Sequence, residues 1–150
     1  MAHLILHGGI MFFNLDGDVG KLSRNLLADV ELVRFGYFCK GISPLVKSNL
    51  SDREKKALQS LKTKGPYFPD LQEMIDAHQQ VRGGTQDGKV SVGKPNIANQ
   101  GKYDRDHFWI IFNLCHNMAD AFPKIYPRID LHEMAGLELK KVLPPLFDIG

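Results

Sequence analysis

Four polar side chains recur at helical spacing in an otherwise apolar segment between residues 105 and 122. They are Asn113, His116, Asn117 and Asp120. Residues three or four apart lie on one face of an α-helix, so these side chains form a single polar stripe. The segment is apolar almost all round, which predicts a central, buried helix. A buried polar stripe costs free energy unless every group is hydrogen bonded, so the stripe needs an explanation.

His116 and Asp120 form an i,i+4 pair within the stripe. Such a pair can chelate a metal ion, or its carboxylate can orient the imidazole as a general base. We therefore predict His116 and Asp120 as catalytic residues, with His107 at the start of the same helix completing the site. Asn113 and Asn117 are the predicted substrate-binding residues. The alternative is structural, with the stripe as a solvent-facing surface or as a satisfied network between two helices.

A further histidine, His78, shares a predicted helical face with Met74 and Ile75. If its helix packs against the helix of the polar stripe, His78, His116 and Asp120 make a two-histidine, one-carboxylate metal site. That set of ligands suits a divalent ion: zinc, iron or manganese. The alternative is that His78 is a hydrogen-bonded packing residue, the usual role of a histidine that faces a core.

The two cysteines, Cys39 and Cys115, are too few for a disulfide-stabilised secreted domain. They fit a reducing compartment, and the sequence leaves open whether they pair. Neither is predicted as a nucleophile. Cys115 lies in an apolar stretch, where burial raises the pKa of a thiol, and Cys39 lies near a helix C-terminus, away from an activating dipole.

Hydrophobic periodicity predicts five helices that position these side chains. They are expected from about Leu22 to Gly41, from 51 to 64, from 70 to 81, from 105 to 122, and from about 130 to 143. Local capping patterns mark four of the starts. These are Ser51 with Glu54, Asp70 with Glu73, Asp104 alone, and Asp130 with Glu133.

The predicted sheet content is small. Residues 3–15 are apolar with an interruption at Gly8-Gly9, which indicates two short strands or one strand with a bulge. Asp87-Gly88 predicts a hairpin near 86–93, with a strand over 89–92. These elements predict an α+β, mainly helical fold in a single domain that spans residues 1–150.

The glycine-rich segment 83–102 is the longest predicted loop. Loops of this length are usually functional or mobile, so we expect it to act as a lid over a substrate. Basic residues surround it: Arg82, Lys89, Lys94 and Lys102. Six more lie between Lys47 and Lys64. These charges could bind phosphate groups, although charge on an exposed helix face more often serves solvation.

Composition is that of an ordinary globular protein. The 150 residues are 43% hydrophobic and 24% charged, with a net charge of +2. This balance does not indicate nucleic acid or an anionic membrane as a partner. No apolar run reaches the length of a membrane span, and the N-terminus does not resemble a signal peptide. We therefore expect a soluble, cytoplasmic protein, with signal-less export left open.

Two classes of function remain open. The first is a small hydrolase-type enzyme, metal-assisted or metal-free, built on the His116 and Asp120 stripe. The second is a non-enzymatic protein-binding domain, such as an inhibitor or adaptor, with aromatic residues for an interface. No specific catalytic motif decides whether the chain is an enzyme. A small molecule or a protein is the favoured partner over a nucleic acid.

Overall fold

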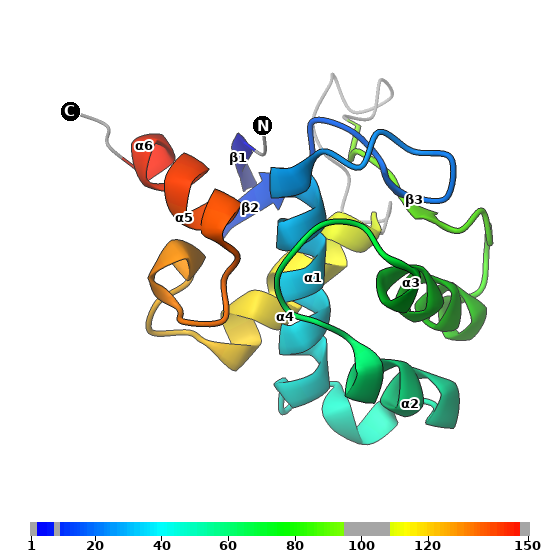
Figure 1. The fold of residues 1–150 in the computed structure, drawn as a ribbon. Coiled ribbons are helices and arrows are strands. Elements are labelled where there is room, and N and C mark those ends of the chain that lie inside the picture. The colour runs from blue at the N-terminus through cyan, green and yellow to red at the C-terminus, as the bar shows by residue number, and fades with distance from the viewer. Residues whose placement is uncertain (1–2, 8–9, 95–108, 148–150) are drawn as a thin grey trace.

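The computed structural model describes residues 3–7, 10–94 and 109–147 (Figure 1). In chain order the elements are β1 (His3–His7), β2 (Ile10–Asn14), β3 (Val19–Gly20), α1 (Leu27–Ile42), the 3-10 helix η1 (Lys47–Asn49), α2 (Asp52–Ser60), α3 (Pro69–Arg82), β4 (Lys89–Val90), α4 (Ile110–Ala121), the 3-10 helix η3 (Ile129–Leu131), α5 (Leu137–Val142) and α6 (Pro144–Phe147). The predicted class, α+β and mainly helical, is confirmed.

α1 is the central helix, and α4 crosses it (Figure 1). Most of α1 is buried on every side, polar residues included. α4 buries one face and part of its margins, so the prediction that it would be the central helix is wrong. Gly36 allows the close crossing, because a Cβ atom there would lie 2.7 Å from the Cβ of Leu114 on α4.

Two small antiparallel pairs of strands complete the fold. β1 pairs with β2, with Leu4 opposite Phe13, which agrees with two strands at the N-terminus. β4 lies within the strand expected at 89–92, but it does not form a local hairpin. Its partner is β3, with Val19 opposite Val90, so the pairing joins two distant parts of the sequence.

The start of α2 follows the predicted local pattern, and the start of α1 does not. The Ser51 hydroxyl accepts a hydrogen bond from the Glu54 N–H, and the Glu54 carboxylate accepts one from the Ser51 N–H. α1 begins at Leu27 and not near Leu22, whose side chain is 96% exposed. The chain turns before the helix, because Leu22 and Asn25 both take positive φ.

The last helices also begin later than predicted. Asp130 lies in η3, and α5 begins at Leu137. The N–H groups of Glu138 and Leu139 donate to the Glu31 carboxylate on α1, at 2.9 and 3.2 Å. A residue from another helix therefore caps α5, in place of the predicted local pair. Within the described ranges, no helix has the length and apolar character of a membrane span.

Candidate functional site

The predicted polar stripe lies on α4, and its members have different environments. Asn117 is 3% exposed, Asn113 and Asp120 are half-buried, and His116 is exposed. The His116 ring packs edge-on against Phe12 of β2, with 5.1 Å between ring centroids. The stripe therefore follows the margin of the buried face of α4.

Asp120 binds the turn that follows α1. Its carboxylate accepts hydrogen bonds from the Ser43 hydroxyl and, at 3.3 Å, from the Leu45 N–H. Ser43 is the residue at which α1 ends. These contacts connect the C-terminal ends of α1 and α4, which is the structural alternative for this part of the stripe.

His78 lies in the core between α1 and α3. It is 4% exposed, and its Nδ1 atom lies 2.9 Å from the hydroxyl of Tyr37. Burial lowers the pKa of His78 to about 3, and the positive charges of Lys40 and Arg82 act in the same direction. His78 is therefore neutral at physiological pH, and its contacts match those of a hydrogen-bonded packing residue.

The three predicted metal ligands are not brought together. His78 faces Tyr37, Asp120 binds the turn after α1, and His116 lies against β2. Within residues 3–7, 10–94 and 109–147, no group of three or more His, Cys, Asp or Glu side chains could hold a metal ion. The structure therefore does not support a zinc, iron or manganese site on these ligands. His107, Asp104 and the part of the predicted lid from residue 95 to 102 lie outside the described residues.

Both cysteines are buried and free, so they do not pair. Cys115 joins α4 to β2, because its sulfur accepts a hydrogen bond from the Phe13 N–H at 3.3 Å. Burial raises the pKa of Cys115 to about 12 and raises that of Cys39 as well. The expected rise in the thiol pKa of Cys115 is confirmed, and such thiols react slowly at neutral pH.

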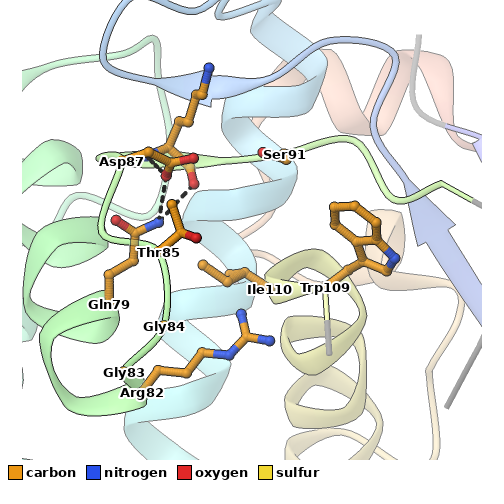
Figure 2. Close-up of a pocket in the computed structure, with 10 residues that line it drawn as sticks. Gln79, Arg82, Gly83, Gly84, Thr85, Asp87, Ser91, Trp109 and Ile110 are labelled. Carbon is orange, nitrogen blue, oxygen red and sulfur yellow. Dashed lines mark hydrogen bonds between the residues drawn. The ribbon is translucent and has the colours of Figure 1, made fainter. Parts of the chain in front are cut away.

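A pocket of about 680 Å³ lies where the C-terminal end of α3 meets the N-terminal end of α4 (Figure 2). Its walls come from the last turn of α3, from segment 83–91, and from Trp109 and Ile110. We refer to it as the α3–α4 pocket. Its volume is typical of small-molecule sites.

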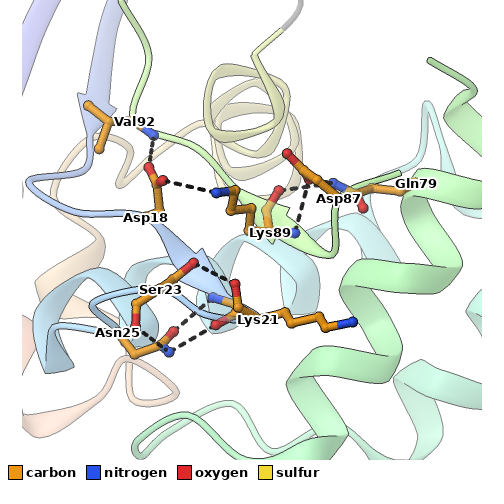
Figure 3. Close-up of polar contacts among 9 residues, drawn as sticks. Asp18, Lys21, Ser23, Asn25, Gln79, Asp87, Lys89 and Val92 are labelled. Atoms are coloured by element: carbon orange, nitrogen blue, oxygen red, sulfur yellow. Dashed lines mark hydrogen bonds and ion pairs between the residues drawn. The ribbon is translucent and has the colours of Figure 1, made fainter. Parts of the chain in front are cut away.

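One wall of the pocket is held in place by α3. The buried Gln79 side chain accepts a hydrogen bond from the Gly88 N–H at 2.8 Å and donates to the Lys89 carbonyl at 2.9 Å. Gln79 also donates to the Asp87 carboxylate at 3.0 Å (Figures 2 and 3). The Asp18 carboxylate accepts from the Val92 N–H at 2.9 Å (Figure 3). This part of the predicted lid is therefore an anchored wall.

Two consecutive glycines form the turn between α3 and this wall. Gly83 and Gly84 both take φ of 75°, a left-handed conformation that is strained for other residues. α3 therefore ends directly after Arg82, and the chain turns back along the pocket (Figure 2).

Arg82 supplies a cationic group to the pocket. Its guanidinium reaches from the end of α3 toward the start of α4 (Figure 2) and makes no hydrogen bond or ion pair with any described residue. Arg82 is exposed at the mouth of the pocket, and the partial burial of its guanidinium lowers its pKa, an effect that Tyr37 partly offsets. Lys40 on α1 is 8% exposed and close enough to repel the charge of Arg82. An anion in the pocket would relieve this repulsion.

The sequence indicated some of these residues and missed others. The positive charges at Arg82 and Lys89 stood out beside the glycine-rich segment. Trp109 and Gln79 gave no signal, because each resembles an ordinary helix or core residue until the tertiary structure places it beside the segment.

Comparisons with protein-family models, curated proteins and solved structures found no match to this chain. Function is therefore argued from the residues of the α3–α4 pocket themselves.

Proposed function

We propose that this domain binds a small anionic ligand in the α3–α4 pocket. The observation that carries the proposal is the Arg82 guanidinium, which lines the pocket without a partner in the described chain. A guanidinium offers a planar set of donors that matches a carboxylate or a phosphate group. Of the two partners that the sequence favoured, a small molecule or a protein, the ligand proposed for this pocket is a small molecule.

The other walls of the pocket suggest the rest of the ligand. Trp109 and Ile110 provide an indole ring and an aliphatic side chain on the α4 side. Asp87 also lines the pocket, but its carboxylate already accepts hydrogen bonds from Gln79 and from the Lys89 N–H. The favoured ligand is therefore a compound with one carboxylate or phosphate group and an aromatic or aliphatic part.

Trp109 allows binding to be measured directly, because it is the one tryptophan of the chain and lines the pocket. Phenyl phosphate and phenol are suitable probes, because they share a ring and differ in charge. We expect phenyl phosphate to change the fluorescence of Trp109 at concentrations where phenol has little effect. In Arg82→Met the affinity should fall by about tenfold or more, since a hydrogen-bonded charge pair is lost.

The matched control is Arg53→Met, which removes an arginine from α2 that is ion-paired with Glu73. This variant should bind phenyl phosphate as the unmodified protein does. Equal affinity for phenyl phosphate and phenol, or unchanged binding in Arg82→Met, would show that Arg82 does not recognise an anion in this pocket.

The hydrolase-type hypothesis stays a prediction, as does a cytoplasmic location. The described contacts of Asp120 and His116 do not favour the hypothesis, since Asp120 bonds Ser43 and His116 lies against Phe12. It can be tested with p-nitrophenyl acetate and p-nitrophenyl phosphate. A hydrolysis rate above buffer that disappears in His116→Ala would make the stripe a catalytic site.

A further inference from the structure

A second hollow lies between α1 and α2, away from the α3–α4 pocket. Its volume is about 590 Å³. Apolar side chains from the end of α1, from the chain after η1 and from α2 line it: Phe38, Ile42, Leu50, Leu58 and Leu61. We refer to it as the α1–α2 groove.

The apolar lining of this groove is partly open to solvent. Ile42 of the lining is 40% exposed, and Phe38, Leu50, Leu58 and Leu61 are half-buried. Gly41, which also lines the groove, lets α2 approach α1 closely, because a Cβ atom there would lie 3.2 Å from Leu58. Exposed apolar side chains gathered at a concave surface are typical of binding sites.

Two lysines give the groove a positively charged edge. Lys47 and Lys55 are exposed and line it directly. Three more lysines follow within the same stretch of chain: Lys56, Lys62 and Lys64. In the described part of the chain, none of these five lysines forms an ion pair with a carboxylate, whereas Arg53 pairs with Glu73 at 2.6 Å.

The acidic residues of this stretch do not balance the lysines. Glu54 is buried and uses its carboxylate in the capping interaction at the start of α2. Asp52 is the first residue of α2, where a negative charge interacts favourably with the helix dipole. The groove therefore combines an apolar floor with an unbalanced positive rim.

We propose that the α1–α2 groove binds an acidic, amphipathic segment of a partner protein. Apolar side chains of the segment would enter the groove, and its carboxylates would meet Lys47 and Lys55. Amphipathic segments commonly bind in this way, with apolar anchors in a groove and charges at the edge. This proposal is independent of the ligand in the α3–α4 pocket.

Charge and shape favour a protein segment over the other polyanions. A nucleic acid would place its phosphates and polar groups over an apolar floor, whereas interfaces with nucleic acids are polar. An anionic membrane is flat and is entered by protruding apolar side chains. A concave floor instead matches side chains that project from a segment of protein.

The test measures the binding of three labelled synthetic peptides of the same length by fluorescence anisotropy. The first has leucine and phenylalanine at i, i+3, i+4 and i+7 with glutamate elsewhere. The second replaces glutamate with lysine, and the third replaces the apolar residues with serine. We expect binding of the first peptide alone. Lys47→Glu with Lys55→Glu should weaken it by about tenfold or more.

A matched control reverses two charges elsewhere. Lys140 and Lys141 are exposed on α5, so Lys140→Glu with Lys141→Glu makes the same change in net charge away from the groove. This variant should bind as the unmodified protein does. Ile42→Glu should abolish binding with the lysines intact, and circular dichroism would show that each variant is folded.

Several results would overturn the proposal. Equal binding of the acidic and lysine peptides would remove the role of charge, and equal loss in both double variants would remove the role of the groove. If no peptide binds and the protein floats with phosphatidylserine vesicles only when Lys47 and Lys55 are present, the partner would be a membrane surface. If no peptide binds and sedimentation shows a dimer that Ile42→Glu abolishes, the occupant of the groove would be a second copy of this chain.

Discussion

The two ends of α3 carry charged side chains in opposite situations. At its start, Asp70 accepts hydrogen bonds from the Arg34 guanidinium at 2.8 and 3.0 Å and from the Lys62 N–H at 2.9 Å. Arg34 is fully buried and also donates to the carbonyls of Lys62 and Pro66. At the other end of α3, Arg82 lies beside a pocket and has no such partner among the described residues.

The difference separates a charge that serves the fold from a charge available to a ligand. Each nitrogen of the Arg34 guanidinium donates to a group within the protein. The burial of Arg34 is therefore explained by its hydrogen bonds to the loop between α2 and α3 and to the start of α3. Arg82 has its donors directed toward a cavity. The same contrast recurs on α4, where Asp120 is hydrogen bonded while Asn113 Oδ1 and Asn117 Nδ2 have no partner in the described chain.

The largest effect is expected at the satisfied end of α3. Arg34→Met leaves the Asp70 carboxylate and two backbone carbonyls without their donor. We expect the free energy of unfolding to fall by about 3–5 kcal/mol, the usual result of breaking a buried ion pair on one side. Urea unfolding at pH 7 measures it. Arg53→Met, which breaks an exposed pair, should cost under about 1 kcal/mol, and equal losses in the two variants would contradict the contrast.

The second prediction concerns acid sensitivity at His78, between the two ends. Its pKa in the folded state is about 3, below the ordinary value of 6.5, so between these pH values the unfolded chain binds the extra proton. Stability is therefore complete above pH 6.5 and falls as the pH decreases. One proton contributes a slope of at most about 1.4 kcal/mol per pH unit.

His78→Gln tests this prediction, because glutamine can still bond the Tyr37 hydroxyl and does not titrate. Urea midpoints compared between pH 6.5 and 5 should decrease less in this variant than in the unmodified protein. Parallel pH profiles for the two proteins would mean that His78 is not the titrating group.

A smaller effect is expected on α4. Asn117 is 3% exposed and its Nδ2 lacks a partner among the described residues. Leucine has a similar shape and no unsatisfied donor, so Asn117→Leu should be neutral or stabilising, within about 1 kcal/mol. Asp120→Leu removes a hydrogen-bonded group on the same helix and serves as the comparison. A loss in Asn117→Leu as large as in Asp120→Leu would mean that the amide has a structural partner.

The smallest change in stability is expected at Arg82. Arg82→Met removes a charge that Lys40 repels, so the free energy of unfolding should stay within about 0.5 kcal/mol of the unmodified value or rise slightly. The affinity of the same variant for phenyl phosphate should nevertheless fall by about tenfold or more. A strong loss of stability would place Arg82 with Arg34, as a residue that serves the fold.

Local patterns predicted the features that depend on neighbours in the chain. Side chains a few residues apart account for the mainly helical character of the fold, the capping interaction of Ser51 with Glu54, and the strand near residue 89. The stripe on α4 was also predicted as a pattern. The surroundings of each side chain in the stripe were not predicted, because a helical face does not reveal whether it meets another helix, a strand or solvent.

The sequence by itself determined that this chain forms a mainly helical α+β fold, where four of its helices lie, and that basic residues surround a glycine-rich segment. The tertiary structure decided the rest, since it depends on contacts between distant residues. Glu31 caps a helix that begins more than a hundred positions later, β4 pairs with β3, and Asp120 and His78 are used within the fold. Packing likewise left Arg82 beside a cavity, because the energy of a charge depends on which groups surround it.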